Sequence, residues 1–184
     1  NYIAQLSGSR TEIIVDVSTL VTRASGSLSD YGGDSNGNRD MSSDGEFLPM
    51  ILAEETVTDH EKYIDWDEYD LDGDGFVDRL LILHTTKGQE ENPSQSSKIW
   101  SHFTLFDEPI NVDENVKVGH YTMASLRTGS SGMGTILHEM LHQMGALDLY
   151  PVHDSGQLNN WQGVGDWDIM ASGNWTKPIH WSKT

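Results

Sequence analysis

Two histidines one helical turn apart have the clearest capacity for chemistry in this sequence. The run His138-Glu-Met-Leu-His142 places two imidazoles four residues apart, so on a helix both can converge on one metal ion about 2.0–2.1 Å away. Glu139 lies a further third of a turn round the helix, where it can reach a water on the ion's open position and take its proton. Taken alone, the pattern equally fits an amphipathic helix with two surface histidines.

The residues that follow favour zinc catalysis. Gly145 can adopt the positive φ that ends a helix and turns the chain, and Asp148 comes three residues later. A carboxylate on the returning chain would be a third protein ligand and would leave the fourth position to water, as in catalytic zinc sites. The spacing therefore predicts zinc on His138, His142 and Asp148, with Glu139 activating the zinc-bound water for peptide-bond hydrolysis.

A run of acidic residues predicts a structural calcium loop. Oxygen donors recur at alternate positions and a glycine follows the second and third acids, as in the first half of an EF-hand loop. The expected ligands are Asp70, Asp72, Asp74, the backbone carbonyl of Phe76, and Asp78. Position twelve is Leu81 rather than the bidentate glutamate, so we expect a loop that holds the next strand and not a calcium sensor. A solvated turn without an ion is the alternative.

A long polar loop, residues 25–45, carries a weaker calcium pattern. Asp34, Asn36, Asn38 and Asp40 alternate along it in a way that could wrap a calcium ion. A plain solvated loop is the favoured interpretation.

Hydrophobic periodicity predicts the elements that position these residues. Strands are expected at residues 12–17, 79–84, 98–102 and 116–123, and a helix at residues 46 to about 63. The histidine helix begins after Gly132, and the chain beyond Tyr150 is expected to be irregular. On that helix an apolar stripe lies almost opposite the two histidines: Met133, Ile136, Leu137, Met140, Leu141 and Met144.

Composition limits the class of protein. The 184 residues fit one compact domain, and the net charge of −18 disfavours nucleic acid and anionic lipid as partners. There is no cysteine, which excludes disulfides, thiolate zinc sites and cysteine nucleophiles. No run of about 18 apolar residues is present, so membrane insertion is not expected.

Four blocks, taken together, resemble the immune inhibitor A family of secreted bacterial metalloproteases, metallopeptidase family six. They are residues 69–78 (YDLDGDGFVD), 99–102 (IWSH), 138–150 (HEMLHQMGALDLY) and 163–173 (GVGDWDIMASG). The resemblance implies an α+β zincin with a metzincin-like layout, in which a mixed, twisted sheet lies over the active-site helix. It also implies Met170 in a turn beneath the metal, secretion, and Zn²⁺ as the catalytic cofactor. Together with the acidic loop, it leads us to expect a zinc endopeptidase that acts on polypeptide substrates and is stabilised by Ca²⁺.

Several alternatives stay open at this stage. Residues 1–184 are expected to form a single catalytic domain, and one interpretation is a domain that lacks its first strand and helix, since zincins begin with such a segment. The residue that steadies the oxyanion is unassigned among Tyr121, Tyr150 and His180. The rival function is a noncatalytic calcium-binding surface or adhesion module with a relic or structural metal site. A zinc amidase or deacetylase would keep the same ligands. Oligomeric state is not indicated.

Overall fold

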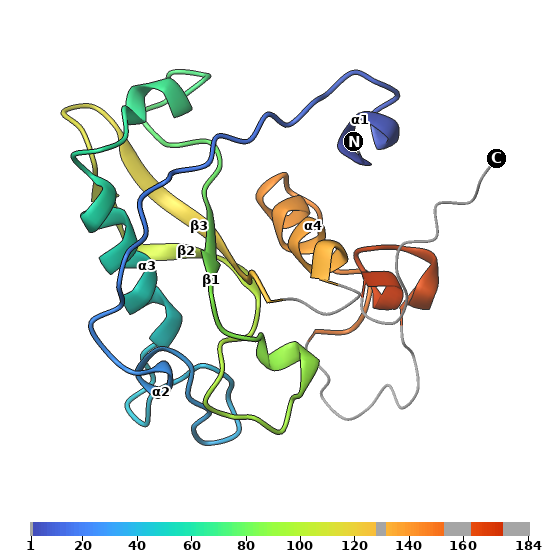
Figure 1. Cartoon of the computed structure of the whole chain (residues 1–184). Helices are drawn as coiled ribbons and strands as arrows, with labels where there is room; N and C mark the ends of the chain where they lie inside the picture. Colours follow the sequence, from blue (N-terminus) through green and yellow to red (C-terminus); the bar gives the residue numbers. More distant parts are fainter. Residues whose placement is uncertain (1, 128–131, 153–162, 175–184) are drawn as a thin grey trace.

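The computed structural model describes residues 2–127, 132–152 and 163–174, which form a small mixed α/β fold (Figure 1). The α-helices are α1 (Tyr2–Leu6), α2 (Leu28–Tyr31), α3 (Leu48–His60) and α4 (Gly132–Gln143). The strands are β1 (Leu81–His84), β2 (His102–Asn111) and β3 (Lys117–Ser125). Short 3-10 helices are η1 (Trp66–Tyr69), η2 (Gln89–Glu91), η3 (Gly165–Trp167) and η4 (Ser172–Asn174).

The three strands form one sheet in the order β1-β3-β2. Strand β3 pairs in parallel with β1 and antiparallel with β2, so Thr122 lies opposite Leu81 on one side and Phe103 on the other. The β2–β3 register shifts between Leu105 and Ile110, where a bulge or irregularity interrupts the ladder. The sheet is therefore mixed, and β3 is its central strand.

Helices α3 and α4 lie on opposite sides of this sheet (Figure 1). Because side chains alternate along a strand, Tyr121 and Met123 of β3 point into the core that includes Val57 of α3. Thr122 points the other way, where its hydroxyl accepts a hydrogen bond from Nε2 of Gln143 at 2.8 Å. The same amide donates to the carbonyl of Leu80 at 2.7 Å, so α4 is tied to the sheet by polar contacts.

Helix α4 buries the face that carries its histidines more deeply than its apolar stripe. Thr135, His138 and Glu139 are buried, whereas Met133 is 66% exposed and the middle of the stripe is half-buried. Hydrophobic periodicity alone does not predict this, because the face that meets β2 and β3 is polar. The histidine face of the helix is thus its inner face.

The predicted strand at residues 12–17 is wrong, because these residues form no strand. Ile14 is 85% exposed and Val17 is 80% exposed. β-Branched residues favour a strand only where a partner ladder and a packed face exist. Neither is present for this segment within the described ranges.

The predicted strands at residues 79–84 and 116–123 and the two predicted helices are confirmed with shifted ends. The predicted strand at residues 98–102 is wrong, because residues 98–101 form no strand. Helix α3 begins later than expected, with Phe47 at the N-cap and Pro49 in the first turn. Strand β2 begins only at His102, although Ile99 before it is buried in the core. Of the region beyond Tyr150, the described residues hold only the short helices η3 and η4, as expected. No helix in the described parts is long and apolar enough to cross a bilayer.

Two histidines of the sheet lie in surroundings that disfavour their charged form. Burial lowers the pKa of His84 to about 4, and burial likewise lowers the pKa of His102 to about 4. Both rings have neutral partners: Nδ1 of His84 lies 2.8 Å from Oγ1 of Thr86, and Nδ1 of His102 donates to the carbonyl of Trp100 at 2.7 Å. Both histidines are therefore neutral in the folded chain near pH 7.

This burial predicts that the fold weakens in mild acid. The unfolded chain takes up protons below about pH 6.5 while the folded chain does not, so stability is lost as the pH falls from about 6.5 to about 4. The upper bound is about 3 kcal/mol for each ring. Urea unfolding between pH 7 and 4 measures the slope of the free energy of unfolding against pH. The measurement is made in EDTA so that metal release does not contribute. A His84→Gln/His102→Gln double variant should flatten this slope, and an unchanged slope would refute this assignment.

Candidate active site

Helix α4 ends where the sequence predicts. Gly145 has a φ of 87°. Its N–H donates to the carbonyl of His142 at 2.9 Å, and the N–H of Ala146 donates to the carbonyl of Leu141 at 3.0 Å. These two bonds form a Schellman motif, which needs one residue in the left-handed backbone conformation. Glycine adopts this conformation without strain. The motif turns the chain back so that Asp148 reaches the two histidines.

Three ligand-type atoms converge at the inner face of α4. Nε2 of His138 lies 3.2 Å from Nε2 of His142, and Oδ1 of Asp148 lies 3.2 Å and 3.4 Å from these two nitrogens. Donors held about 2.0–2.1 Å from a tetrahedral ion are about 3.3–3.4 Å apart. The three atoms therefore already form a triangle of the size that one face of a tetrahedral zinc site requires.

The hydrogen bonds of the two rings fix which nitrogen carries the proton. Nδ1 of His138 donates to the carbonyl of Ile169 at 2.7 Å, and Nδ1 of His142 donates to the carbonyl of Ala146 at 2.9 Å. Since a carbonyl can only accept, each Nδ1 carries a proton, and a ring that is neutral then presents a lone pair on Nε2. Burial lowers the pKa of His138 below its ordinary value, which favours this neutral form.

When both rings are neutral, the triangle consists of three acceptors that face one another. Oδ1 of Asp148 is buried and has no hydrogen-bond partner among the described residues. Lone pairs in this arrangement repel each other and lose their hydration, which is unfavourable unless a cation joins them. The donor set of two imidazoles and one carboxylate fits zinc.

Glu139 lies beside this group but in a different environment. A carboxylate oxygen of Glu139 lies within 4.8 Å of a ring nitrogen of both His138 and His142. The side chain is 6% exposed, and burial first, then the charge of Asp148, raises its pKa well above the ordinary value. A hydrogen bond from the backbone N–H of Phe103 lowers it in part. Glu139 is thus a buried carboxyl with an enhanced affinity for a proton.

The turn that contains Met170 supports both halves of the metal group. The carbonyl of Ile169 orients His138, as above, and the carbonyl of Met170 accepts the N–H of Leu149 at 2.7 Å, next to Asp148. Asp168 closes the turn, because its Oδ1 accepts the N–H of Met170 at 2.9 Å. The Met170 side chain is buried.

Comparison with known proteins agrees with this geometry. The profile of the immune inhibitor A peptidase M6 catalytic domain matches residues 1–183.

The chain belongs to the immune inhibitor A peptidase M6 family.

Two curated relatives of this M6-family chain are similar along most of it. Immune inhibitor A of Bacillus thuringiensis subsp. alesti is 26% identical over 180 residues, covering 84% of this chain and 25% of the relative. The pre-pro-metalloprotease PrtV of Vibrio cholerae serotype O1 (strain M66-2) is 28% identical over 181 residues, covering 85% of this chain and 19% of the relative. The chain thus spans a quarter or less of the length of these relatives. The predicted family is confirmed.

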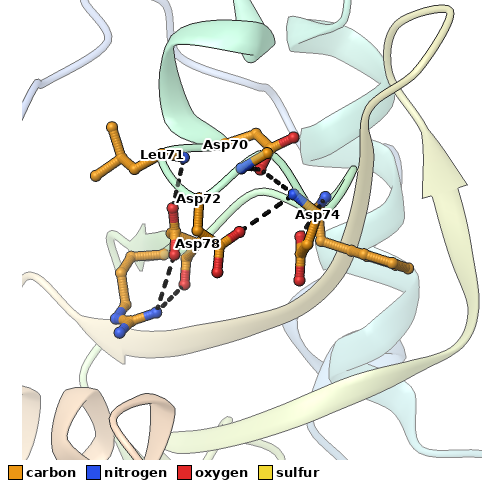
Figure 2. A network of polar contacts seen from close by, with 8 residues as sticks. Asp70, Leu71, Asp72, Asp74 and Asp78 are labelled. Atoms are coloured by element: carbon orange, nitrogen blue, oxygen red, sulfur yellow. Dashed lines mark hydrogen bonds and ion pairs between the residues drawn. The ribbon is translucent and has the colours of Figure 1, made fainter.

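In the acidic loop of this M6-family chain, three of the predicted carboxylates lie close together (Figure 2). Oxygen atoms of Asp70, Asp72 and Asp74 lie within 4.8 Å of one another. Asp78 contacts the start of the loop through a hydrogen bond from the N–H of Leu71 at 2.8 Å. The carboxylates also accept backbone N–H groups within the loop, with Asp70 accepting those of residues 73, 74 and 75. The acids are held close together before any cation is added.

The same loop is joined to the central strand. Phe76 forms a parallel bridge with Lys117, whose N–H donates to the carbonyl of Gly75 at 3.0 Å. The N–H of Val77 donates back to the carbonyl of Lys117 at 2.9 Å. Since β1 begins shortly after Asp78, the loop lies between the end of η1 and the first strand.

Sequence reasoning missed three groups around the zinc-type site of this M6-family chain. Phe103 donates its N–H to Glu139 and stacks on the ring of His142, with ring centroids 6.5 Å apart. The carbonyls of Ala146 and Ile169 fix the histidine tautomers. Backbone groups carry no sequence signature, and Phe103 is 36 positions from Glu139. Of the oxyanion candidates, Tyr121 is fully buried in the core and His180 lies outside the described residues.

Proposed function

We propose that this chain is the catalytic domain of a zinc-dependent endopeptidase that is stabilised by calcium. One observation supports this above all. Two neutral imidazole nitrogens and a buried, unpartnered carboxylate oxygen lie 3.2–3.4 Å apart, next to a glutamate that is not part of the triangle. Family membership adds that this arrangement occurs in a peptidase domain.

His138, His142 and Asp148 are the proposed zinc ligands. Zinc bound there would supply a Lewis acid that polarises the scissile carbonyl and lowers the pKa of a coordinated water. The protein's own contribution is preorganisation, because the carbonyls of Ile169 and Ala146 hold both rings in the tautomer that binds metal.

Glu139 is the proposed general base. Its buried carboxylate takes a proton from the attacking water and returns it to the leaving amine. A carboxyl with a raised pKa is suited to this role, because it holds the proton firmly enough to carry it between the two steps. The N–H of Phe103 keeps the carboxylate oriented during the transfer.

Met170 and Tyr150 are proposed to support the site. We assign Met170 to the turn beneath the metal, because that turn contacts His138 and the Asp148 segment through its backbone carbonyls. The ring of Tyr150 stacks on His138 with centroids 6.4 Å apart, and burial raises the pKa of Tyr150 to about 12. Its hydroxyl therefore stays protonated and can donate a hydrogen bond. The sheet with α4 on one face supports the zincin, metzincin-like layout.

For the calcium loop we propose Asp70, Asp72, Asp74, Asp78 and the carbonyl of Phe76 as ligands. The clustered carboxylates support this proposal, since like charges this close are unfavourable without a cation. The bridge to Lys117 supports a structural role rather than a sensing one.

The setting of the enzyme is also a proposal. The peptidase family and the relative named as a metalloprotease support polypeptide substrates, and the resemblance to the family supports a secreted, extracellular protein. The net charge of −18 argues against nucleic acid as a partner. Residues 1–184 are taken as one catalytic domain.

Metal-specific rescue tests the proposed function. The chain is stripped with EDTA, and casein cleavage is measured after adding zinc, calcium or both. We expect full recovery only with both ions, because zinc completes the reaction centre and calcium restores the loop that precedes β1. Zinc alone should bind but leave a poorly folded, weakly active protein.

Each other outcome removes a part of the proposal. Cleavage in the stripped sample would exclude a metallopeptidase. Full recovery with zinc alone would exclude the calcium requirement. Calcium binding without tightly held zinc or cleavage would favour the noncatalytic module. Deacylation of small amides without casein cleavage would favour an amidase.

A further inference from the structure

A second group of oxygen atoms lies between the loop at residues 34–40 and helix η2, where Asp40 and Gln89 are buried and Asp34 is exposed. Asp40 is 2% exposed, and its Oδ1 has no hydrogen-bond partner among the described residues. Gln89 is fully buried, and its Oε1 likewise has no partner there. Two buried acceptors without donors are unfavourable, because each has lost its hydration without gaining a hydrogen bond.

Hydrogen bonds bring both side chains to Asp34. The amide Nε2 of Gln89 donates to Oδ2 of Asp34 at 2.8 Å, and the N–H of Asp40 approaches Oδ1 of Asp34 at 3.3 Å. The other oxygen of Asp40 accepts the backbone N–H of Trp100 at 2.9 Å. Residues that are 55 and 60 positions apart in the sequence are thus joined around one group of oxygen atoms.

The charge around Asp40 is not balanced. Asp34 and Glu90 are close enough to raise its pKa further, after burial itself. Arg39 partly offsets them, but its guanidinium stacks 3.6 Å over the Trp100 ring. Glu90 is engaged elsewhere, since its carboxylate accepts the hydroxyl of Ser101 at 2.6 Å.

We propose that Asp34, Asp40 and Gln89 hold a divalent cation of the calcium type, separate from the loop at residues 70–78. The free oxygens of Asp40 and Gln89 and the carboxylate of Asp34 are hard donors, which calcium prefers and which complete its shell with carbonyls and water. Left-handed φ values of 53° at both Asn36 and Asp40 curl the loop back on itself. Figure 1 places this loop near α2, toward the end of the molecule opposite η1 and the 70–78 loop.

A cation here would also support the catalytic side of the sheet. It would join the 34–40 loop to η2 and to the segment that leads into β2. That segment carries Trp100, on which Arg39 is stacked, and continues to Phe103, which contacts Glu139 and His142. The site would therefore fix the chain that leads to the general base.

Calcium titration of the zinc-loaded chain tests this proposal, with Asp40→Asn as the main variant. The amide keeps an acceptor for the Trp100 N–H but removes the buried charge. We expect Asp40→Asn to lose one calcium-binding event, or to weaken it at least about tenfold, by calorimetry. Without calcium its Tm should equal or exceed that of the unsubstituted chain, since an unpaired buried charge is gone. The calcium-induced rise in Tm should shrink.

Two further variants make the result specific. Asp44→Asn changes an exposed carboxylate of the same region and should bind calcium as the unsubstituted chain does. Gln89→Met removes Oε1 without changing charge and should weaken the same binding event, which covers the case in which Asp40→Asn does not fold. Identical calcium stoichiometry and affinity in Asp40→Asn and Gln89→Met would overturn the proposal. In that case the two oxygens share a proton instead of a cation.

Discussion

Glu139→Gln is expected to lower kcat for peptide hydrolysis by about 10²–10⁴-fold while the chain keeps its zinc. Glutamine has nearly the same shape and still accepts the N–H of Phe103, so the buried site should stay packed. It cannot take a proton from water, because an amide is not a base at neutral pH. The loss should therefore appear in kcat and leave KM nearly unchanged.

Zinc content by elemental analysis and casein kinetics on one preparation measure both parts of this prediction. Glu46→Gln, at an exposed position before α3, is the matched control and should retain full activity. If Glu139→Gln lost its zinc, Glu139 would be a ligand rather than the base. Undiminished turnover would assign proton transfer to another group.

The convergence of His138, His142 and Asp148 could be predicted from sequence because its geometry is mostly local. His138 and His142 are one helical turn apart, and the Schellman motif at Gly145 returns the chain to Asp148 within three residues. Helix pitch and one glycine conformation are enough to bring the three ligand atoms together. The calcium-type loop is local in the same sense, since its carboxylates lie within nine consecutive residues.

Features that depend on distant segments could not be predicted. The buried face of α4 is decided by Thr122 and Leu80, which receive the Gln143 amide across the sheet. The apolar stripe of α4 predicts that the other face is the more deeply buried one. Hydrophobic periodicity does not show which polar groups find hydrogen-bond partners. The segment at residues 12–17 failed for the related reason that strand propensity does not supply a neighbouring strand.

The buried oxygens at Asp40 and Gln89 illustrate an intermediate case. The alternating acids and amides at residues 34–40 gave a weak signal for a cation, and a solvated loop was the favoured interpretation. Only the fold shows that Gln89, far along the chain, adds a buried acceptor to the group. Spacing alone could not distinguish a hydrated acidic loop from one whose oxygens are closed off from water.

Asp148→Ala is the second variant with a large expected effect, and its sign should depend on zinc. In the zinc-loaded chain, loss of a ligand should weaken zinc binding by about 100-fold or more and abolish casein cleavage. The Tm should fall toward that of the metal-free protein, because the free energy of zinc binding contributes to folding. In EDTA the same variant should be as stable as the unsubstituted chain or more stable, since Oδ1 then faces two nitrogen lone pairs without a partner.

Zinc titration and thermal unfolding with and without EDTA measure this reversal. Asp113→Ala, an exposed carboxylate in the β2–β3 connection, is the control and should change neither quantity appreciably. A purely structural Asp148 would lower the Tm equally in both conditions, because its contacts would stabilise the fold whether or not metal is present. A reversal confined to Asp148 thus identifies the carboxylate as a metal ligand, since only a ligand changes from unfavourable to favourable when the ion arrives.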